Sequence, residues 1–165
     1  MALYEIKEEK ERVILVGVST RENDDTEDSL DELKDLVKTA GAEAVGRVIQ
    51  KRELVHPGTY VGKGKIEEIR ERWWELDATG IVCDDELSPA QMNNLEHELE
   101  CKVMDRTLLI LDIFAKHATT SEGKIQVELA QLRYRASRLV GRGASLSRLG
   151  GGIGTRGPGD KKLES

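Results

Sequence analysis

Aromatic residues, cysteines and long apolar runs are all scarce in this 165-residue chain. Phe, Trp and Tyr make up only 4% of the residues, so a surface that stacks several bases on aromatic rings is not expected. Two cysteines, Cys83 and Cys101, are too few for a disulfide framework and lack the neighbours of a zinc knuckle, which favours buried, reduced thiols. No segment approaches the roughly 20 apolar residues of a transmembrane helix, and the charged N-terminus has no signal-peptide cleavage site. We therefore expect a cytoplasmic protein without a membrane span.

Charge is distributed unevenly along the chain, although the formal net charge is only −6. Residues 1–105 carry 26 acidic and 14 basic residues, whereas residues 106–165 carry 5 acidic and 11 basic residues. The net charges of the two parts are therefore −12 and +6. Half of the 16 glycines lie within residues 141–165. This pattern predicts an acidic body followed by a basic arm that ends in a glycine-rich segment.

Short apolar runs alternate with helix-period segments over the first two-thirds of the chain. The alternation predicts an α/β domain with a four-stranded, mostly parallel sheet and flanking helices. We expect the first helix to begin after an acidic loop, with Asp28 or Ser29 as its cap, and a loop at 51–64 to precede the second helix. The run Ser88-Pro-Ala-Gln91 predicts a capping box at the start of a third helix. The expected strands lie at 13–18, 44–49, 80–83 and 102–104.

The hydrophobic period changes at residue 106. Two apolar helices joined by a short polar loop predict an antiparallel hairpin over 106–148, and a glycine-rich segment follows at 149–165. The second helix carries several arginines that suit RNA phosphates, although a charged run also fits a solvated helix face. Composition alone therefore leaves RNA binding and a solvated interdomain helix equally open. These arginines are Arg133, Arg135, Arg138 and Arg142.

Several short motifs fail the structural context that their chemistry requires. Residues 152–157 fit the dinucleotide pattern G-x-G-x-x-G, but they follow a helix instead of joining a strand to one. The glycine runs at 58–63 and 154–159 miss the P-loop spacing or its lysine. The acidic residues 84–86 fit a structural role ahead of a helix better than a metal site. We predict no catalytic residue and no metal ligand in this chain.

A nucleotide site is the alternative that the residues leave open. Lys63, Gly64 and Lys65 form a lysine-bearing glycine loop ahead of an expected helix, where a phosphate could bind. Asp84 or Asp85 would then hold magnesium at the carboxyl edge of the sheet. This alternative predicts a small nucleotide-binding α/β domain.

Six sequence blocks occur in a fixed order and together cover nearly the whole chain. They resemble the N-terminal domain and helical linker of the HflX family, whose members are ribosome-associated GTPases. The blocks are residues 40–43 with 50–52, 59–65, 84–91, 105–107 with 110–114, 122–124 with 126–132, and 148–159.

The resemblance implies binding to the large (50S) ribosomal subunit, and dissociation of ribosomes under stress, by the full-length protein with GTP and Mg²⁺. The hairpin tip, residues 117–124, would approach ribosomal RNA near the peptidyl-transferase region. The family's GTPase domain follows the segment that matches 150–164, and its motifs are missing here, so we expect no GTP hydrolysis by this chain alone. The GTPase domain itself would be an intramolecular partner. The implied RNA-binding residues are Thr119, Thr120, Ser121, Lys124, Arg133, Arg135, Arg138, Arg142, Arg148 and Arg156.

Overall fold

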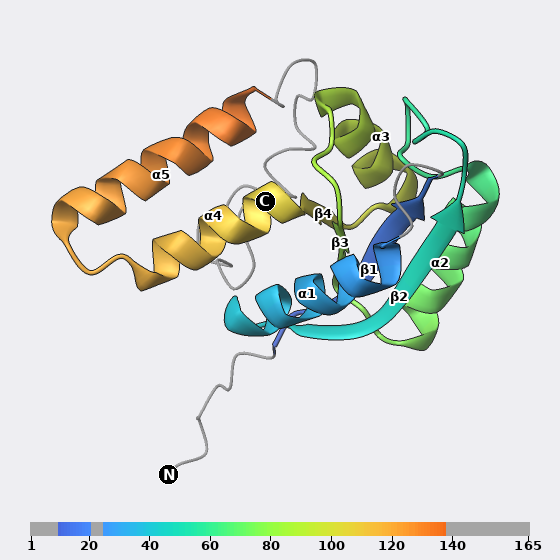
Figure 1. Cartoon of the computed structure of the whole chain (residues 1–165), viewed down its shortest axis with the longest axis horizontal. Coiled ribbons are helices and arrows are strands. Elements are labelled where there is room, and N and C mark those ends of the chain that lie inside the picture. Colours follow the sequence, from blue (N-terminus) through green and yellow to red (C-terminus); the bar gives the residue numbers. More distant parts are fainter. Residues whose placement is uncertain (1–9, 21–24, 138–165) are drawn as a thin grey trace, which may run out of the picture.

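A computed structural model of the chain describes residues 10–20 and 25–137. A four-stranded parallel sheet with the strand order β2-β1-β3-β4 forms its centre, and a two-helix hairpin projects from one side (Figure 1). This arrangement confirms the predicted α/β fold. The elements are β1 (Arg12–Ser19), α1 (Thr26–Thr39), β2 (Glu43–Lys51), α2 (Lys63–Glu75), β3 (Gly80–Cys83), α3 (Pro89–Leu99), β4 (Lys102–Asp105), α4 (Arg106–His117) and α5 (Ser121–Ala136).

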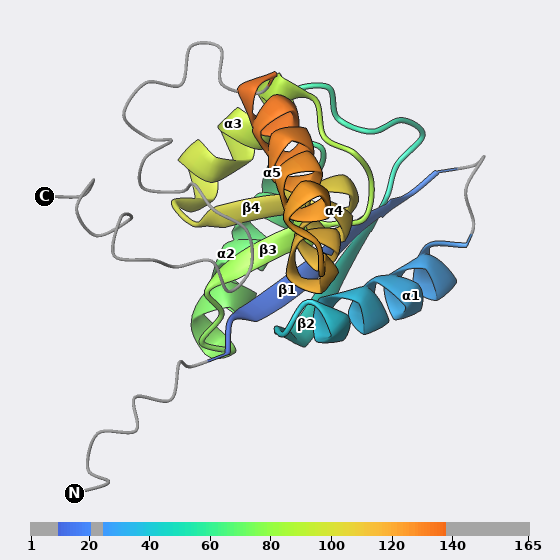
Figure 2. The ribbon, with the colours of Figure 1, turned by 90° about the vertical axis from the view of Figure 1, so that its left-hand side faces the viewer.

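Helices cover both faces of the sheet. α1 packs on β1, β2 and α4, and α2 and α3 contact each other on the opposite face (Figure 2). The central strand β1 is accordingly buried over Val13–Val18, which explains its unbroken apolar run. β2 is added on one side of β1, whereas β3 and β4 are added on the other side. The strand order therefore reverses at β1, and the switch point of the sheet lies between β1 and β3.

The helix starts differ from two of the sequence expectations. α1 begins at Thr26 with Asp25 as its N-cap, so the predicted cap at Asp28 or Ser29 was wrong. The earlier start arises from tertiary packing, because Thr26 is buried and its methyl group lies close to Gly17 of β1. α2 begins at Lys63, which places Lys63–Lys65 in a helical first turn and not in a loop.

The third helix and the hairpin follow the predictions. The Ser88 hydroxyl accepts a hydrogen bond from Gln91 N–H, and the Gln91 side chain accepts one from Ser88 N–H, at 3.1 and 2.9 Å. α4 and α5 pack against each other as an antiparallel pair (Figure 1). Residues 138–148 of the predicted hairpin, and the glycine-rich segment 149–165, lie outside the described residues. The domain division at residue 105 stays a prediction.

In the part of the chain that the structure describes, no helix has both the length and the apolar character that crossing a membrane requires.

Candidate nucleic-acid interface

The hairpin tip presents small hydroxyl side chains on a helix N-terminus. The hydroxyl oxygen of Thr120 accepts a hydrogen bond from Gly123 N–H at 2.9 Å and so caps α5. A Cβ atom at Gly123 would lie 2.9 Å from that oxygen, which explains the glycine. Thr119, Thr120, Ser121 and Lys124 are all exposed. Capping uses an acceptor orbital of Thr120, so its hydroxyl proton remains able to donate to an RNA acceptor.

The predicted RNA-contacting cations of α5 do not share one surface. Lys124 and Arg133 are exposed but stand nine residues apart, which places them on opposite sides of the helix. Arg135 is half-buried and lies near Lys102 and Asp112, whose pKa values its charge lowers. Arg135 therefore faces the α/β domain more than solvent. Arg138, Arg142, Arg148 and Arg156 lie outside the described residues.

An apolar stripe runs along the outer side of α5. Ile125, Leu129 and Leu132 follow a four-then-three spacing on one side of the helix and are 64%, 45% and 64% exposed. No residue of α5 is fully buried. The sequence predicts an apolar helix here, but periodicity shows only that an apolar face exists and not which neighbour covers it.

Asp105, the last residue of β4, joins this strand to α4, to α5 and to the segment ahead of α3. Its carboxylate is fully buried, and its Oδ1 accepts the Leu108 N–H at 2.9 Å as the N-cap of α4. Its Oδ2 accepts the Leu87 N–H, ahead of α3, at 2.9 Å, and a short hydrogen bond from the Tyr134 hydroxyl of α5. Sequence reasoning did not assign a role to Asp105 or Tyr134. The only signal was the position of Asp105 directly before an apolar helix, which is typical of an N-cap.

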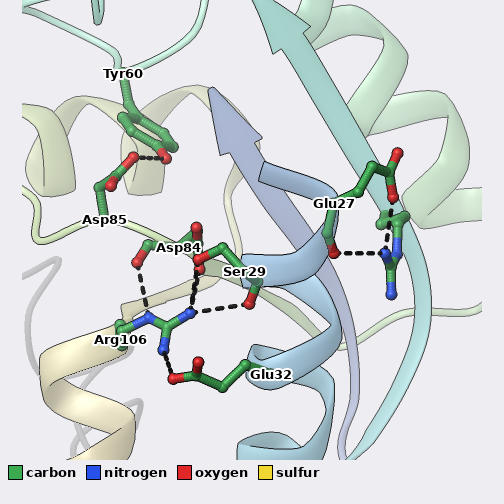
Figure 3. A network of polar contacts seen from close by, with 8 residues as sticks. Glu27, Ser29, Glu32, Tyr60, Asp84, Asp85 and Arg106 are labelled. Carbon is green, nitrogen blue, oxygen red and sulfur yellow. Dashed lines mark hydrogen bonds and ion pairs between the residues drawn. The ribbon is translucent and has the colours of Figure 1, made fainter. Parts of the chain in front are cut away.

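The neighbouring Arg106 fixes the start of α4 to the sheet and to α1 (Figure 3). Its guanidinium lies 2.6 Å from Asp84 Oδ1 and 2.6 Å from Glu32 Oε1. It also donates to the carbonyl and hydroxyl oxygens of Ser29, each at 3.0 Å. The Asp84 carboxylate is therefore committed to an ion pair.

The Asp85 side chain points away from Arg106, and its Oδ2 atom accepts a hydrogen bond from the Tyr60 hydroxyl at 2.5 Å (Figure 3). Tyr60 is fully buried in a left-handed conformation with φ of 67°. Burial is the main cause that raises the pKa of the Tyr60 hydroxyl, and the neighbouring Cys83 and Asp85 raise it further. The phenol therefore stays protonated and donates to Asp85, so Asp84 and Asp85 both have structural partners.

Lys63, Gly64 and Lys65 form the uncapped first turn of α2. No side chain caps this helix, its first turn has no acidic residue, and Gly64 has open space above its Cα. The charge of Lys65 already has a partner, because its ammonium forms an ion pair with Glu68 Oε1 at 3.3 Å. Backbone N–H groups and two lysines at one helix end are compatible with an anion, which is the feature that the nucleotide alternative requires.

Two regions of this α/β chain and its hairpin match the N-terminal and middle parts of GTP-binding GTPases. Residues 27–115 match the family described as GTP-binding GTPase N-terminal, and residues 117–165 match the GTP-binding GTPase middle region. The chain belongs to the HflX family of GTPases.

The curated relatives are longer than this chain. It is 74% identical over 162 residues to the GTPase HflX of Lacrimispora saccharolytica, and this match covers 98% of this chain and 38% of that protein. It is 49% identical over 155 residues to the GTPase HflX of Escherichia coli, and this match covers 94% of this chain and 36% of that protein. The chain thus spans less than two-fifths of these relatives.

A solved structure has a similar fold. The crystal structure of a GTP-binding protein from the hyperthermophilic archaeon Sulfolobus solfataricus, in complex with GDP, matches with a TM-score of 0.59 and 26% identity. The match covers 77% of this chain and 38% of that chain.

Proposed function

We propose that this chain is the ribosome-binding region of an HflX-type GTPase and that its α4–α5 hairpin contacts RNA of the large ribosomal subunit. The full-length protein would use GTP and Mg²⁺ to dissociate ribosomes in the cytoplasm under stress. The observation that carries the proposal is the exposed hairpin tip, where Thr119, Thr120 and Ser121 stand beside Lys124.

The shape of the hairpin supports contact inside a folded RNA. The 12 residues of α4 correspond to a helix about 18 Å long, at about 1.5 Å per residue, so the tip stands well away from the start of the hairpin. Small hydroxyl side chains at the tip can reach base edges and sugar oxygens without steric conflict. The tip therefore fits a narrow RNA cavity better than an open duplex surface.

The placement of the cations supports the same geometry. Lys124 and Arg133 lie on opposite sides of α5, so a flat phosphate surface cannot contact both. An inserted hairpin meets RNA on more than one side, and each cation would then neutralise a different phosphate.

The proposal is tested by sedimentation of the chain with purified large ribosomal subunits at several salt concentrations. Lys124→Glu and Arg133→Glu should each weaken binding about tenfold and reduce the slope of log affinity against log salt by about 1. Lys34→Glu makes the same charge change at an exposed position of α1 and should have little effect. No binding at low salt, or equal binding by all three variants, would overturn the proposal.

Nucleotide binding at the start of α2 is a second candidate. The uncapped first turn with Lys63 and Lys65 favours it, because an anion there would meet both the helix dipole and two ammonium groups. Calorimetry with ATP and GTP should then show magnesium-dependent heat that Lys63→Ala abolishes and that Lys51→Ala, at an exposed lysine of β2, retains. Absence of heat with both nucleotides contradicts this candidate.

A further inference from the structure

The two helices of the hairpin are attached to the α/β domain in different ways. Leu108 and Leu109 of α4 are buried in the core, and Arg106 ties the start of α4 to Asp84 and to α1. α5 has no fully buried residue. The position of α4 is therefore fixed by burial, whereas α5 is held by residues that are at most half-buried.

Tyr134, in the last turn of α5, packs on the apolar core of the α/β domain. Its ring packs against the buried apolar cluster, and its hydroxyl donates to Asp105 Oδ2. Asp105 is fully buried and is itself held by the backbone N–H groups of Leu87 and Leu108. The acceptor for Tyr134 is thus a rigid, charged group in a site from which water is excluded, where such a hydrogen bond is strong.

We propose that Tyr134 is a positioning residue: its hydroxyl bond to Asp105 docks the end of α5 and sets the orientation of Arg133. This inference rests on the proposed function, because the orientation matters for RNA contact. In the docked state both helices present their exposed residues in one arrangement. Without the bond, α5 pivots at the tip and only a fraction of molecules presents Arg133 correctly, which weakens binding by that fraction.

Tyr134→Phe removes only the hydroxyl oxygen and keeps the ring in its packing site. The loss of a hydrogen bond to a charged acceptor should shift the ratio of docked to undocked α5 by about tenfold or more. Thr39→Val is the matched control, since it removes a hydroxyl that bonds to the Asp35 carbonyl within α1, in an exposed position.

The docking itself is measured by the distance between two spin labels at exposed positions, Lys34→Cys on α1 and Ala136→Cys at the end of α5. Both natural cysteines are buried, and the chain without the two new cysteines gives the labelling background. The Thr39→Val chain should give one narrow distance distribution, and Tyr134→Phe should give a broad or shifted one. In the same chains without labels, Tyr134→Phe should bind large ribosomal subunits about twofold more weakly at fixed salt, because a tenfold shift from a docked fraction of about 90% leaves about 50% docked. Thr39→Val should bind normally.

The outcomes separate the inference from the function on which it rests. An unchanged distance distribution in Tyr134→Phe overturns the docking role, and a broadened distribution with unchanged binding overturns the positioning role. If the wild-type chain does not bind the subunit but Tyr134→Phe still broadens the distribution, the proposed function is overturned and the docking contact is supported.

Discussion

The guanidinium of Arg106 lies 2.6 Å from the Oδ1 atom of Asp84, whose side chain is only 5% exposed. Removing Arg106 therefore leaves a buried carboxylate without its cation. We expect Arg106→Ala to lower the free energy of unfolding by about 3 kcal/mol, because the loss of one partner of a buried pair exposes the cost of burying the other. Urea denaturation monitored by circular dichroism measures this change.

Arg47→Ala is the control for Arg106→Ala, because Arg47 also pairs with acidic residues of α1. Its partners, Glu27 and Asp31, are 71% and 68% exposed, so water can solvate them when the arginine is removed. We expect a loss below about 1 kcal/mol. Equal losses in the two variants would show that burial of Asp84 does not strengthen its dependence on Arg106.

The fold could be predicted from the sequence because its signals are local. The unbroken apolar run of β1 indicated a strand covered on both faces, and the Ser88-to-Gln91 pattern located the start of α3. The start of α1 could not be found in this way. Thr26 extends the helix because it packs on Gly17, and no periodic pattern contains that contact.

The candidate site was only partly predictable for a similar reason. The hydroxyl-rich tip could be predicted because a polar loop between two apolar helices is a pattern in one short segment. The bonds at the base of the hairpin join residues that are distant in sequence: the separation in residue number is 77 for Ser29 and Arg106 and 29 for Asp105 and Tyr134. The sequence pattern predicted the same RNA-binding role for Arg133 and Arg135. Only the packing of α5 shows that Arg133 is exposed whereas Arg135 is half-buried.

Two glycines should respond to alanine in opposite directions. A Cβ at Gly80 in β3 would lie 2.8 Å from the Lys102 carbonyl oxygen, so Gly80→Ala forces the backbone of β4 to shift. We expect a loss of about 1–3 kcal/mol in the free energy of unfolding. Gly64 has no neighbouring atom within 4 Å in the first turn of α2, so Gly64→Ala should add up to about 1 kcal/mol by raising helix propensity. Urea titrations of both variants test these signs, and destabilisation by Gly64→Ala would contradict the helical start at Lys63.

Asp112 should make the stability of the chain pH-dependent. Its side chain is 1% exposed, and burial raises the pKa of its carboxyl group, although Lys116, at 3.7 Å, Lys102 and Arg135 lower it and Glu11 raises it. The folded chain thus holds this proton at pH values where the unfolded chain has lost it. Stability from this group is greatest below the ordinary carboxyl pKa and declines as the pH rises through the raised value.

Replacing Asp112 with its neutral isostere tests that direction. We expect Asp112→Asn to raise the free energy of unfolding at pH 7 by on the order of 1 kcal/mol, and the advantage to shrink as the pH is lowered and the wild-type carboxyl group takes up its proton. Asp35→Asn, at an exposed position of α1, should show no such pH-dependent gain. If Asp112→Asn destabilises the chain at pH 7, the ion pair with Lys116 outweighs the burial of the charge.

His56 should adopt a single neutral tautomer. Its Nδ1 atom lies 3.0 Å from the backbone nitrogens of both Gly58 and Thr59, so it accepts from two N–H groups and the ring proton resides on Nε2. Nitrogen chemical shifts of the imidazole at neutral pH report this tautomer directly, and a proton on Nδ1 would contradict the turn geometry. Because an asparagine Oδ1 can accept in the same way, we expect His56→Asn to keep most of the stability and His56→Ala to lose about 1 kcal/mol. Equal losses would mean that the Nδ1 acceptor does not stabilise the turn that leads to Tyr60.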